Sequence, residues 1–176
     1  MRSDTIYIDN SGNGFDKALE QTLKAAGYCG LNEKESLHLR LCTEEMLSLA
    51  RSVTGEMKAS FWLESEGRRF ELHMSTKTVM DKDKRYQLIS SASSHRNEAA
   101  NSFLGKLRDA FERAMTADAD HTFYELPEDI AGDLPGGYIA DPEWDRYERS
   151  ILRKVADDVK IAIRGGVVDM TVVKSF

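Results

Sequence analysis

The chain has 176 residues, of which 41% are hydrophobic and 31% are charged, as in an ordinary globular protein. This length is enough for one domain with a hydrophobic core, and it gives little reason to expect two. The net charge of -6 argues against a general nucleic-acid-binding protein, because neutralising phosphates requires a basic surface.

The first part of the chain predicts a strand followed by two helices. Residues 1–8 form the strand, and a turn cluster of Asn, Ser and Gly residues then supplies a candidate helix cap. Apolar residues at helical spacing predict a first helix that begins at Phe15 and ends at Gly27. A second helix begins at Asn32, where Glu35 follows three positions later as in a capping box.

This second helix runs to about residue 53 and carries two stripes of side chains. One stripe is almost uniformly apolar and is expected to face a sheet; it consists of Leu39, Cys42, Met46, Leu49 or Ala50, and Val53. The other stripe consists of Leu37, Leu41, Glu44 and Ser48, spaced four, three and four residues apart. Glu44 interrupts an apolar face, and burying an unpaired carboxylate is costly. It is therefore expected to be exposed, paired or placed there for chemistry.

Alternating apolar and polar residues predict two hairpins. The first joins residues 57–63 to residues 70–74. The second joins residues 159–164 to residues 167–173 across a Gly-Gly turn, which is a strong hairpin signal. A helix from about residue 143 to residue 156 precedes this second hairpin.

The middle of the chain, residues 76–142, has the weakest pattern. Residues 82–85 are rich in charge, and we expect Asp81 and Asp83 to lie on the solvated surface. Residues 90–94 are small and polar, so we expect a flexible linker there. A helix is expected over residues 103–114. The acidic segment of residues 117–141 predicts an ordered but irregular excursion.

Cysteine and histidine positions give no sign of a disulfide or metal framework. Cys29 and Cys42 are too few and too far apart for a disulfide scaffold or a zinc knuckle, and the four histidines have no ligand spacing. No apolar run approaches membrane-spanning length, and residues 1–8 lack the apolar core of a signal peptide. We therefore expect a cytoplasmic protein with reduced cysteines, without a membrane or nucleic-acid partner.

The element order predicts one α+β domain over residues 1–176, with an antiparallel or mixed sheet covered on one face. With the Glu44 helix in second position, this order resembles the histidine-kinase-like ATPase domain of the GHKL superfamily, and within it the small bacterial anti-sigma-factor serine kinases. Two segments carry the resemblance: Leu41–Ser48 is similar to the family's N box, and Ile151–Ile161 is similar to its last helix and the run into its final hairpin. The resemblance implies a two-layer α/β sandwich with a mixed sheet, in which residues 76–142 replace the family's ATP lid.

The resemblance also implies a nucleotide site. In the family, the N-box Glu is a general base or orients the attacking group, and an Asn one helical turn later holds Mg²⁺ against the phosphates of ATP. Glu44 takes the catalytic role, and Ser48 takes the role of Mg²⁺ ligand and cofactor-binding residue. Ser75 stands where the family has an adenine-reading Asp, and Lys77 stands where it has a Gly. Asp81 and Asp83 lie beyond the strand and are not expected to replace the adenine-reading Asp.

Several positions depart from the family's pattern. Ser48 reaches less far than Asn, and Ser75 lacks the charge that strengthens an Asp contact. The family's phosphate-cradling glycines before the last helix are replaced by the bulky and acidic residues 143–148. Gly105 and Lys106 remain as a further candidate contact to phosphate.

We therefore interpret Glu44 as the mark of an old nucleotide cleft rather than as a working catalytic residue. On the residues alone, the alternative is a carboxylate that is solvated or paired with Arg40 or Arg51. The first functional hypothesis is a regulatory domain with a degenerate ATP site that binds a sigma factor or an antagonist-like regulator, as relatives do, commonly as dimers. The alternatives are an active serine kinase that uses ATP and Mg²⁺, and a small-molecule sensor.

Overall fold

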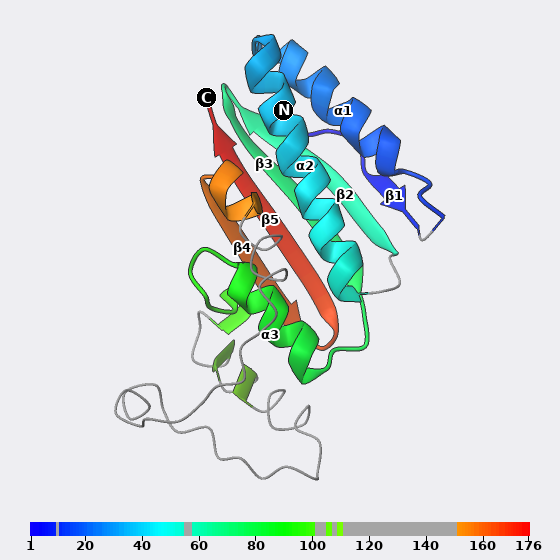
Figure 1. Ribbon diagram of the computed structural model, residues 1–176, viewed down its shortest axis with the longest axis vertical. Coiled ribbons are helices and arrows are strands. Elements are labelled where there is room, and N and C mark those ends of the chain that lie inside the picture. The colour runs from blue at the N-terminus through cyan, green and yellow to red at the C-terminus, as the bar shows by residue number, and fades with distance from the viewer. Residues whose placement is uncertain (10, 55–57, 101–104, 107–108, 111–150) are drawn as a thin grey trace.

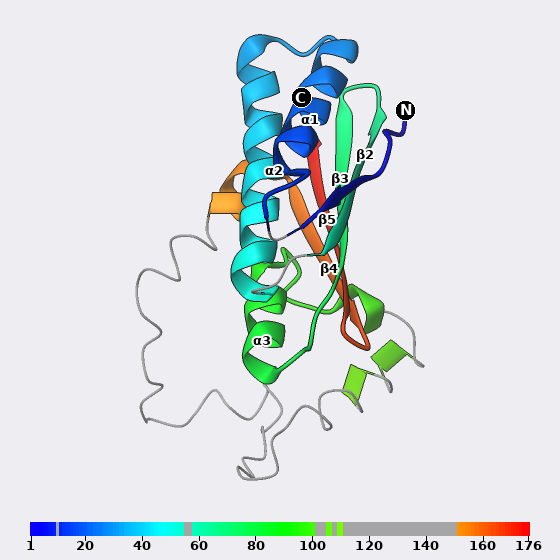
Figure 2. The same cartoon turned by 90° about the vertical axis from the view of Figure 1, so that its right-hand side faces the viewer.

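The computed structural model describes residues 1–9, 11–54, 58–100, 105–106, 109–110 and 151–176. Within them, a five-stranded sheet lies against a layer of helices (Figures 1 and 2). The elements in chain order are β1 (Ile6–Ile8), α1 (Phe15–Tyr28), α2 (Glu33–Thr54), β2 (Ala59–Glu66), β3 (Arg69–Lys77), α3 (Lys82–Ser91), a 3₁₀ turn at Glu98–Ala100, β4 (Asp158–Arg164) and β5 (Val167–Ser175). Residues 151–155 are also helical. No helix in these ranges combines the length and the apolar character needed to cross a membrane.

The strands follow the order β1-β2-β3-β5-β4, and every described pair is antiparallel. Both predicted hairpins are therefore confirmed, and so is the α+β class. The prediction of a mixed sheet is wrong. Tight turns join the strands of each hairpin, and two helices rather than one connect β1 to β2, so the chain re-enters the sheet in the opposite direction.

A capping box starts α2, as the sequence predicts. The Asn32 backbone N–H donates to Glu35 Oε2 (2.9 Å), and the Glu35 N–H donates to Asn32 Oδ1 (3.0 Å). Arg68, in the β2–β3 turn, forms an ion pair with Glu35 at 2.5 Å. The first turn of α2 is thereby tied to one end of the sheet.

The core lies between α2 and the sheet. The predicted sheet-facing stripe of α2 is confirmed, because Leu39, Cys42, Met46, Ala50 and Val53 are all buried in one cluster with the strands. Desolvation by this burial raises the pKa of the Cys42 thiol to about 12. On another side of α2, the hydroxyl of Thr43 meets that of Thr22 on α1 at 3.0 Å.

Asp81 and Asp83 are exposed, as predicted, but residues 82–85 are not solvated throughout. They begin α3, whose N-cap Asp81 accepts a hydrogen bond from the Lys84 N–H at 2.8 Å. Arg85 is buried, and its guanidinium pairs with the buried carboxylate of Asp109. A charged side chain can be buried here because an opposite charge meets it.

The flexible linker predicted at residues 90–94 is also wrong. Ser91 and Ala92 are buried, and Ser93 is fastened to β4 by two hydrogen bonds. The Ser93 N–H donates to the Val159 carbonyl and the Val159 N–H donates to Ser93 Oγ, both at 2.8 Å. The serine segment is therefore ordered through its contact with β4.

Asn97 closes the same sheet edge further along. Its side-chain amide accepts from the Ile163 N–H at 2.8 Å and donates to the Ile163 carbonyl at 3.1 Å. Residues 93–97 therefore cover part of the outer edge of β4, which would otherwise expose unpaired backbone groups. Of the helix predicted at 103–114, the structure describes helical residues at 105–106 and 109–110, and of the helix at 143–156 it describes residues 151–155. The excursion predicted at 117–141 lies outside the described residues.

Candidate functional site

Glu44 and Ser48 lie one turn apart on the outer surface of α2, and both are exposed. They share this surface with Leu37, which is 52% exposed. The sheet-facing stripe lies on the opposite side of the helix, so the Glu44 and Ser48 side chains point away from the sheet. Within the described part of the chain, neither Arg40 nor Arg51 pairs with Glu44, which leaves its carboxylate in solvent.

A different side of α2 faces the neighbouring helical segments. His38 Nε2 lies 2.9 Å from the Val155 carbonyl oxygen, which identifies the side of α2 that meets residues 151–155. Glu45 follows His38 by two turns, lies on that same side and is half-buried. Leu49 follows one turn later and packs against the core. On the side of α2 that faces residues 151–155, the Glu and the position one turn later are therefore Glu45 and Leu49. The apolar Leu49 side chain offers Mg²⁺ no ligand.

The structure does not bring Ser75 or Lys77 to the helical side of the sheet. Met74 and Thr76 are buried beneath the helices, so the alternation of β3 turns Ser75 and Lys77 toward the other face. There the Ser75 hydroxyl donates to Asp169 Oδ1 at 2.7 Å, and Lys77 is exposed. The inward residue is Thr76, whose hydroxyl donates to the Lys58 carbonyl at 3.1 Å.

The sequence carries a signal for both inward residues. Phe70, Leu72 and Met74 alternate as the apolar face of β3, so the next residue on that face is Thr76 rather than Ser75. In the same way, the apolar stripe of α2 fixes which side of the helix points outward. The spacing of the family motif points instead to Glu44 and Ser75, and so does not identify Glu45 and Thr76.

Apolar side chains from the α3 region and from residues 151–155 extend the core cluster beside α2. Leu88 and Ala92 from the α3 region, together with Leu152, are at most 2% exposed. They belong to the same core cluster as Met46 on α2. Gly105 is half-buried and Lys106 is exposed within a short helical stretch. Residues 143–148, which replace the family's phosphate-cradling glycines, lie outside the described residues.

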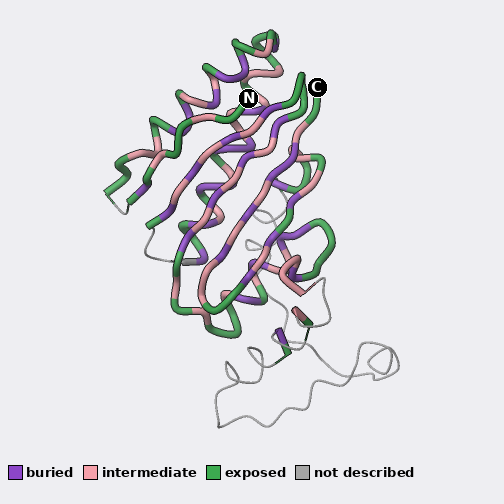
Figure 3. Tube along the Cα trace, turned by 180° about the vertical axis from the view of Figure 1, so that it is seen from behind, coloured by how far each residue is buried: buried purple, intermediate pink, exposed green. Residues whose placement is uncertain are grey.

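The opposite face of the sheet is not covered by any of the described helices (Figure 3). Polar and aromatic residues of β2 and β3 alternate with the buried ones and lie on this face. Trp62 on β2 stacks on His73 of β3, with ring centroids 5.2 Å apart and an interplanar angle of 12°. The Arg2 guanidinium lies over the Trp62 ring at 5.4 Å. Desolvation lowers the pKa of His73, although the carboxylates of Glu64 and Glu71 act in the other direction.

No cluster of three or more His, Cys, Asp or Glu side chains suited to a metal ion occurs among the residues that the structure describes. Comparisons of the chain with protein-family models, with curated proteins and with solved structures gave no match. The functional assignment therefore depends on the geometry of the described residues and on the resemblance in element order and motifs.

Proposed function

We propose that this chain is a regulatory domain of the histidine-kinase-like ATPase type that binds a partner protein and has no working ATP site. The five-stranded sheet with helices on one face supports the architecture from which the resemblance starts. Two inward-facing side chains support the absence of a working ATP site. Leu49 on α2 packs against the core and offers Mg²⁺ no ligand, and the buried Thr76 on β3 donates its hydroxyl to the Lys58 carbonyl.

Phosphoryl transfer needs a carboxylate or other positioning group and a Mg²⁺ ligand directed at the same phosphates. Glu44 and Ser48 have the required spacing, but they lie on the outer surface of α2. Ser75, the counterpart of the base-reading Asp, is hydrogen-bonded to Asp169 on the far face of the sheet. The predicted nucleotide contacts thus point in opposite directions, which favours a domain retained for protein binding.

The proposed partner is a regulator of transcription, either a sigma factor or an antagonist-like protein, and the proposed setting is the bacterial cytoplasm. The free thiols of Cys29 and Cys42 are compatible with a reducing compartment. Under this proposal, partner binding does not depend on a nucleotide. The chain also forms a homodimer, as members of the family commonly do. An ATP-dependent serine kinase would require the opposite dependence.

Photo-crosslinking followed by reconstitution tests this proposal. A photoreactive residue is placed at Ser48 on the helical surface and, in a second variant, at Lys160 on the sheet surface. The crosslinked protein is identified, purified and titrated with the unmodified chain, with and without ATP and Mg²⁺. We expect a defined partner whose dissociation constant changes by less than about twofold on adding nucleotide. A change of tenfold or more in the dissociation constant on adding nucleotide, on the order of 1.4 kcal/mol, would contradict the proposal. The proposal would also be contradicted if neither position crosslinked a protein that binds the purified chain.

A further inference from the structure

Residues 1–3 form a short attachment to the edge of β2 that is distinct from β1. Arg2 lies opposite Glu64 in an isolated antiparallel bridge, whereas Ile6 lies opposite Phe61. Three residues (3–5) therefore lie between these pairs on one strand and two (62–63) on the other, which is the mark of a bulge. The Ser3 N–H donates to the Leu63 carbonyl at 2.9 Å, so the attachment has a backbone hydrogen bond of its own.

Arg2 binds this segment to β2 through a cation–π contact and a solvent-exposed ion pair. Its guanidinium lies over the Trp62 ring, and its Nε lies 3.6 Å from Glu64 Oε1. The Arg2 side chain is 62% exposed and the Glu64 side chain is 44% exposed. Exposed ion pairs of this kind are weak, so another guanidinium could replace that of Arg2.

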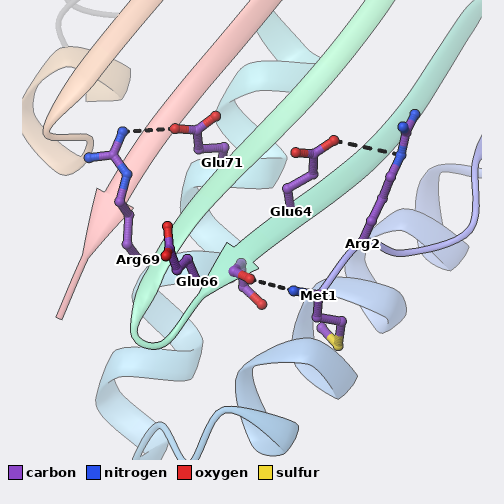
Figure 4. Close-up of a pocket in the computed structure, with 7 residues that line it drawn as sticks. Met1, Arg2, Glu64, Glu66, Arg69 and Glu71 are labelled. Carbon is purple, nitrogen blue, oxygen red and sulfur yellow. Dashed lines mark hydrogen bonds and ion pairs between the residues drawn. The ribbon is translucent and has the colours of Figure 1, made fainter.

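A hollow of about 570 Å³ opens beside this attachment (Figure 4). Carboxylates of Glu64, Glu66 and Glu71 line it together with Arg69, which pairs with Glu71 at 2.7 Å. If residues 1–3 leave, three carboxylates and one guanidinium remain from these lining residues. The hollow then has a negative charge that suits a cationic side chain.

The neighbouring polar groups require more than a simple cation. Among the described residues, the buried Trp62 Nε1 has no hydrogen-bond partner while residues 1–3 occupy the site. The edge of β2 at Leu63 and Ser65 offers the backbone groups that residues 1–3 now use. An extended peptide with an arginine supplies the strand backbone and the guanidinium at once.

We propose that the β2 edge around Trp62 and Glu64 is a docking site for an extended, arginine-bearing segment of a partner protein, and that residues 1–3 of the chain occupy this site as an internal substitute. The partner segment displaces Arg2, places its own arginine over Trp62 and pairs with β2. This inference goes beyond the proposed function and does not depend on it, because neither α2 nor the inward side of the sheet takes part.

The test uses the full chain with Arg2→Ala, which removes the guanidinium that contacts Trp62 and Glu64 and so weakens the attachment of residues 1–3 to β2. The probe is an acetylated, fluorescently labelled peptide with the sequence of residues 1–6, alongside the same peptide with its arginine replaced by alanine. We expect the arginine peptide to bind the variant at least about fivefold more tightly than the alanine peptide, as a lost cation–π contact and ion pair imply. Wild-type protein should bind the arginine peptide more weakly than the Arg2→Ala protein does.

A second readout follows the site directly. In a Trp144→Phe background, the indole N–H resonance of Trp62 should shift on adding the arginine peptide, and Glu64→Gln should weaken the binding. Glu20→Gln, on the surface of α1, is the matched control and should leave the affinity unchanged. Equal binding of the arginine and alanine peptides, or an unshifted Trp62 resonance, would overturn the proposal. Formation of dimers by Arg2→Ala protein mixed with wild type would also overturn it, in favour of a second copy as occupant. A nucleotide titration is independent of all these outcomes, so this inference and the proposed function can fail separately.

Discussion

Glu44 and Glu45 are adjacent in the chain, yet the helix turns their side chains about 100° apart. Glu44 points into solvent, and Glu45 lies half-buried on the side of α2 that faces residues 151–155. A carboxylate in solvent contributes little to stability when it has no partner. The contribution of each Glu to stability therefore depends on which side of α2 its side chain faces.

This difference predicts the effect of Glu44→Ala. Because Glu44 is exposed and pairs with no described residue, its removal should change the free energy of unfolding by less than about 0.5 kcal/mol. Urea unfolding of the wild type and the variant measures this. A loss of several kcal/mol would show that Glu44 is buried and paired, contrary to its position in the structure.

His73 predicts a pH dependence of stability. Desolvation lowers the pKa of His73 in the folded protein below its ordinary value of 6.5, against the opposing effect of Glu64 and Glu71. The unfolded chain then takes up a proton that the folded chain resists. The free energy of unfolding should therefore decrease as the pH falls below about 6.5. The His73 contribution stops changing once the pH is below the pKa of His73 in the folded protein, because both states are then protonated.

Comparing wild type with His73→Gln isolates this contribution, because glutamine does not titrate. Urea unfolding is measured from about pH 8 to about pH 5, across the range in which histidine changes charge. We expect the stability of the wild type relative to the variant to decrease on acidification. An increase would mean that protonated His73 is favoured in the folded state.

At the residue scale, periodicity was a better guide than motif spacing. The apolar alternation of β3 and the apolar stripe of α2 both point to Thr76 and Glu45, whereas the family motif drew attention to Ser75 and Glu44. The Trp62–His73 stack could not be predicted in this way. It depends on which residues of β2 and β3 lie opposite each other, and on Arg2, which is distant in the sequence.

At the element scale, the start of α1 depends on Gly14. Its φ angle is 88°, and a Cβ added there would lie 2.2 Å from the Tyr7 carbonyl oxygen. Gly12 has a similar φ angle of 82°, but a Cβ there would meet nothing within 4 Å. A substitution at Gly12 therefore tests backbone strain alone, whereas a substitution at Gly14 adds a steric clash to the same strain.

Gly12→Ala and Gly14→Ala form a matched pair of variants. Gly12→Ala should lower the free energy of unfolding by about 1–2 kcal/mol, the cost of a left-handed backbone for an L-residue. Gly14→Ala should cost clearly more, because β1 and α1 must also move apart. Thermal or urea unfolding of both variants checks the order, and equal losses would contradict the close approach of Gly14 to Tyr7.

The elements that the sequence failed to predict are held by distant partners. The sequence of α3 shows no clear apolar stripe, and its buried Arg85 is neutralised by Asp109 far along the chain. Ser93 and Asn97 are fixed by β4, more than sixty residues later. Local propensity carries no information about such partners, so it predicts neither the burial of Arg85 nor the ordered serine segment.

At the scale of the whole molecule, element order predicts the α+β class, and the hairpin signals correctly predict the β2–β3 and β4–β5 pairs. The two helices between β1 and β2 make that pair antiparallel, whereas the antiparallel β3–β5 pair joins strands far apart in the sequence and has no local signal. The nucleotide site could not be judged from spacing alone. A working site requires its groups to converge from α2 and β3, whereas Ser48 and Ser75 lie on opposite sides of the molecule.

The central claim is that this fold has no working ATP site. Titration calorimetry of the full chain with ATP, and separately with ADP, in the presence of Mg²⁺ tests it most directly. We predict no saturable heat up to about 1 mM nucleotide, which corresponds to a binding free energy weaker than about -4 kcal/mol. Saturable binding at micromolar nucleotide that is lost in Glu44→Ala or Glu45→Ala would contradict the account.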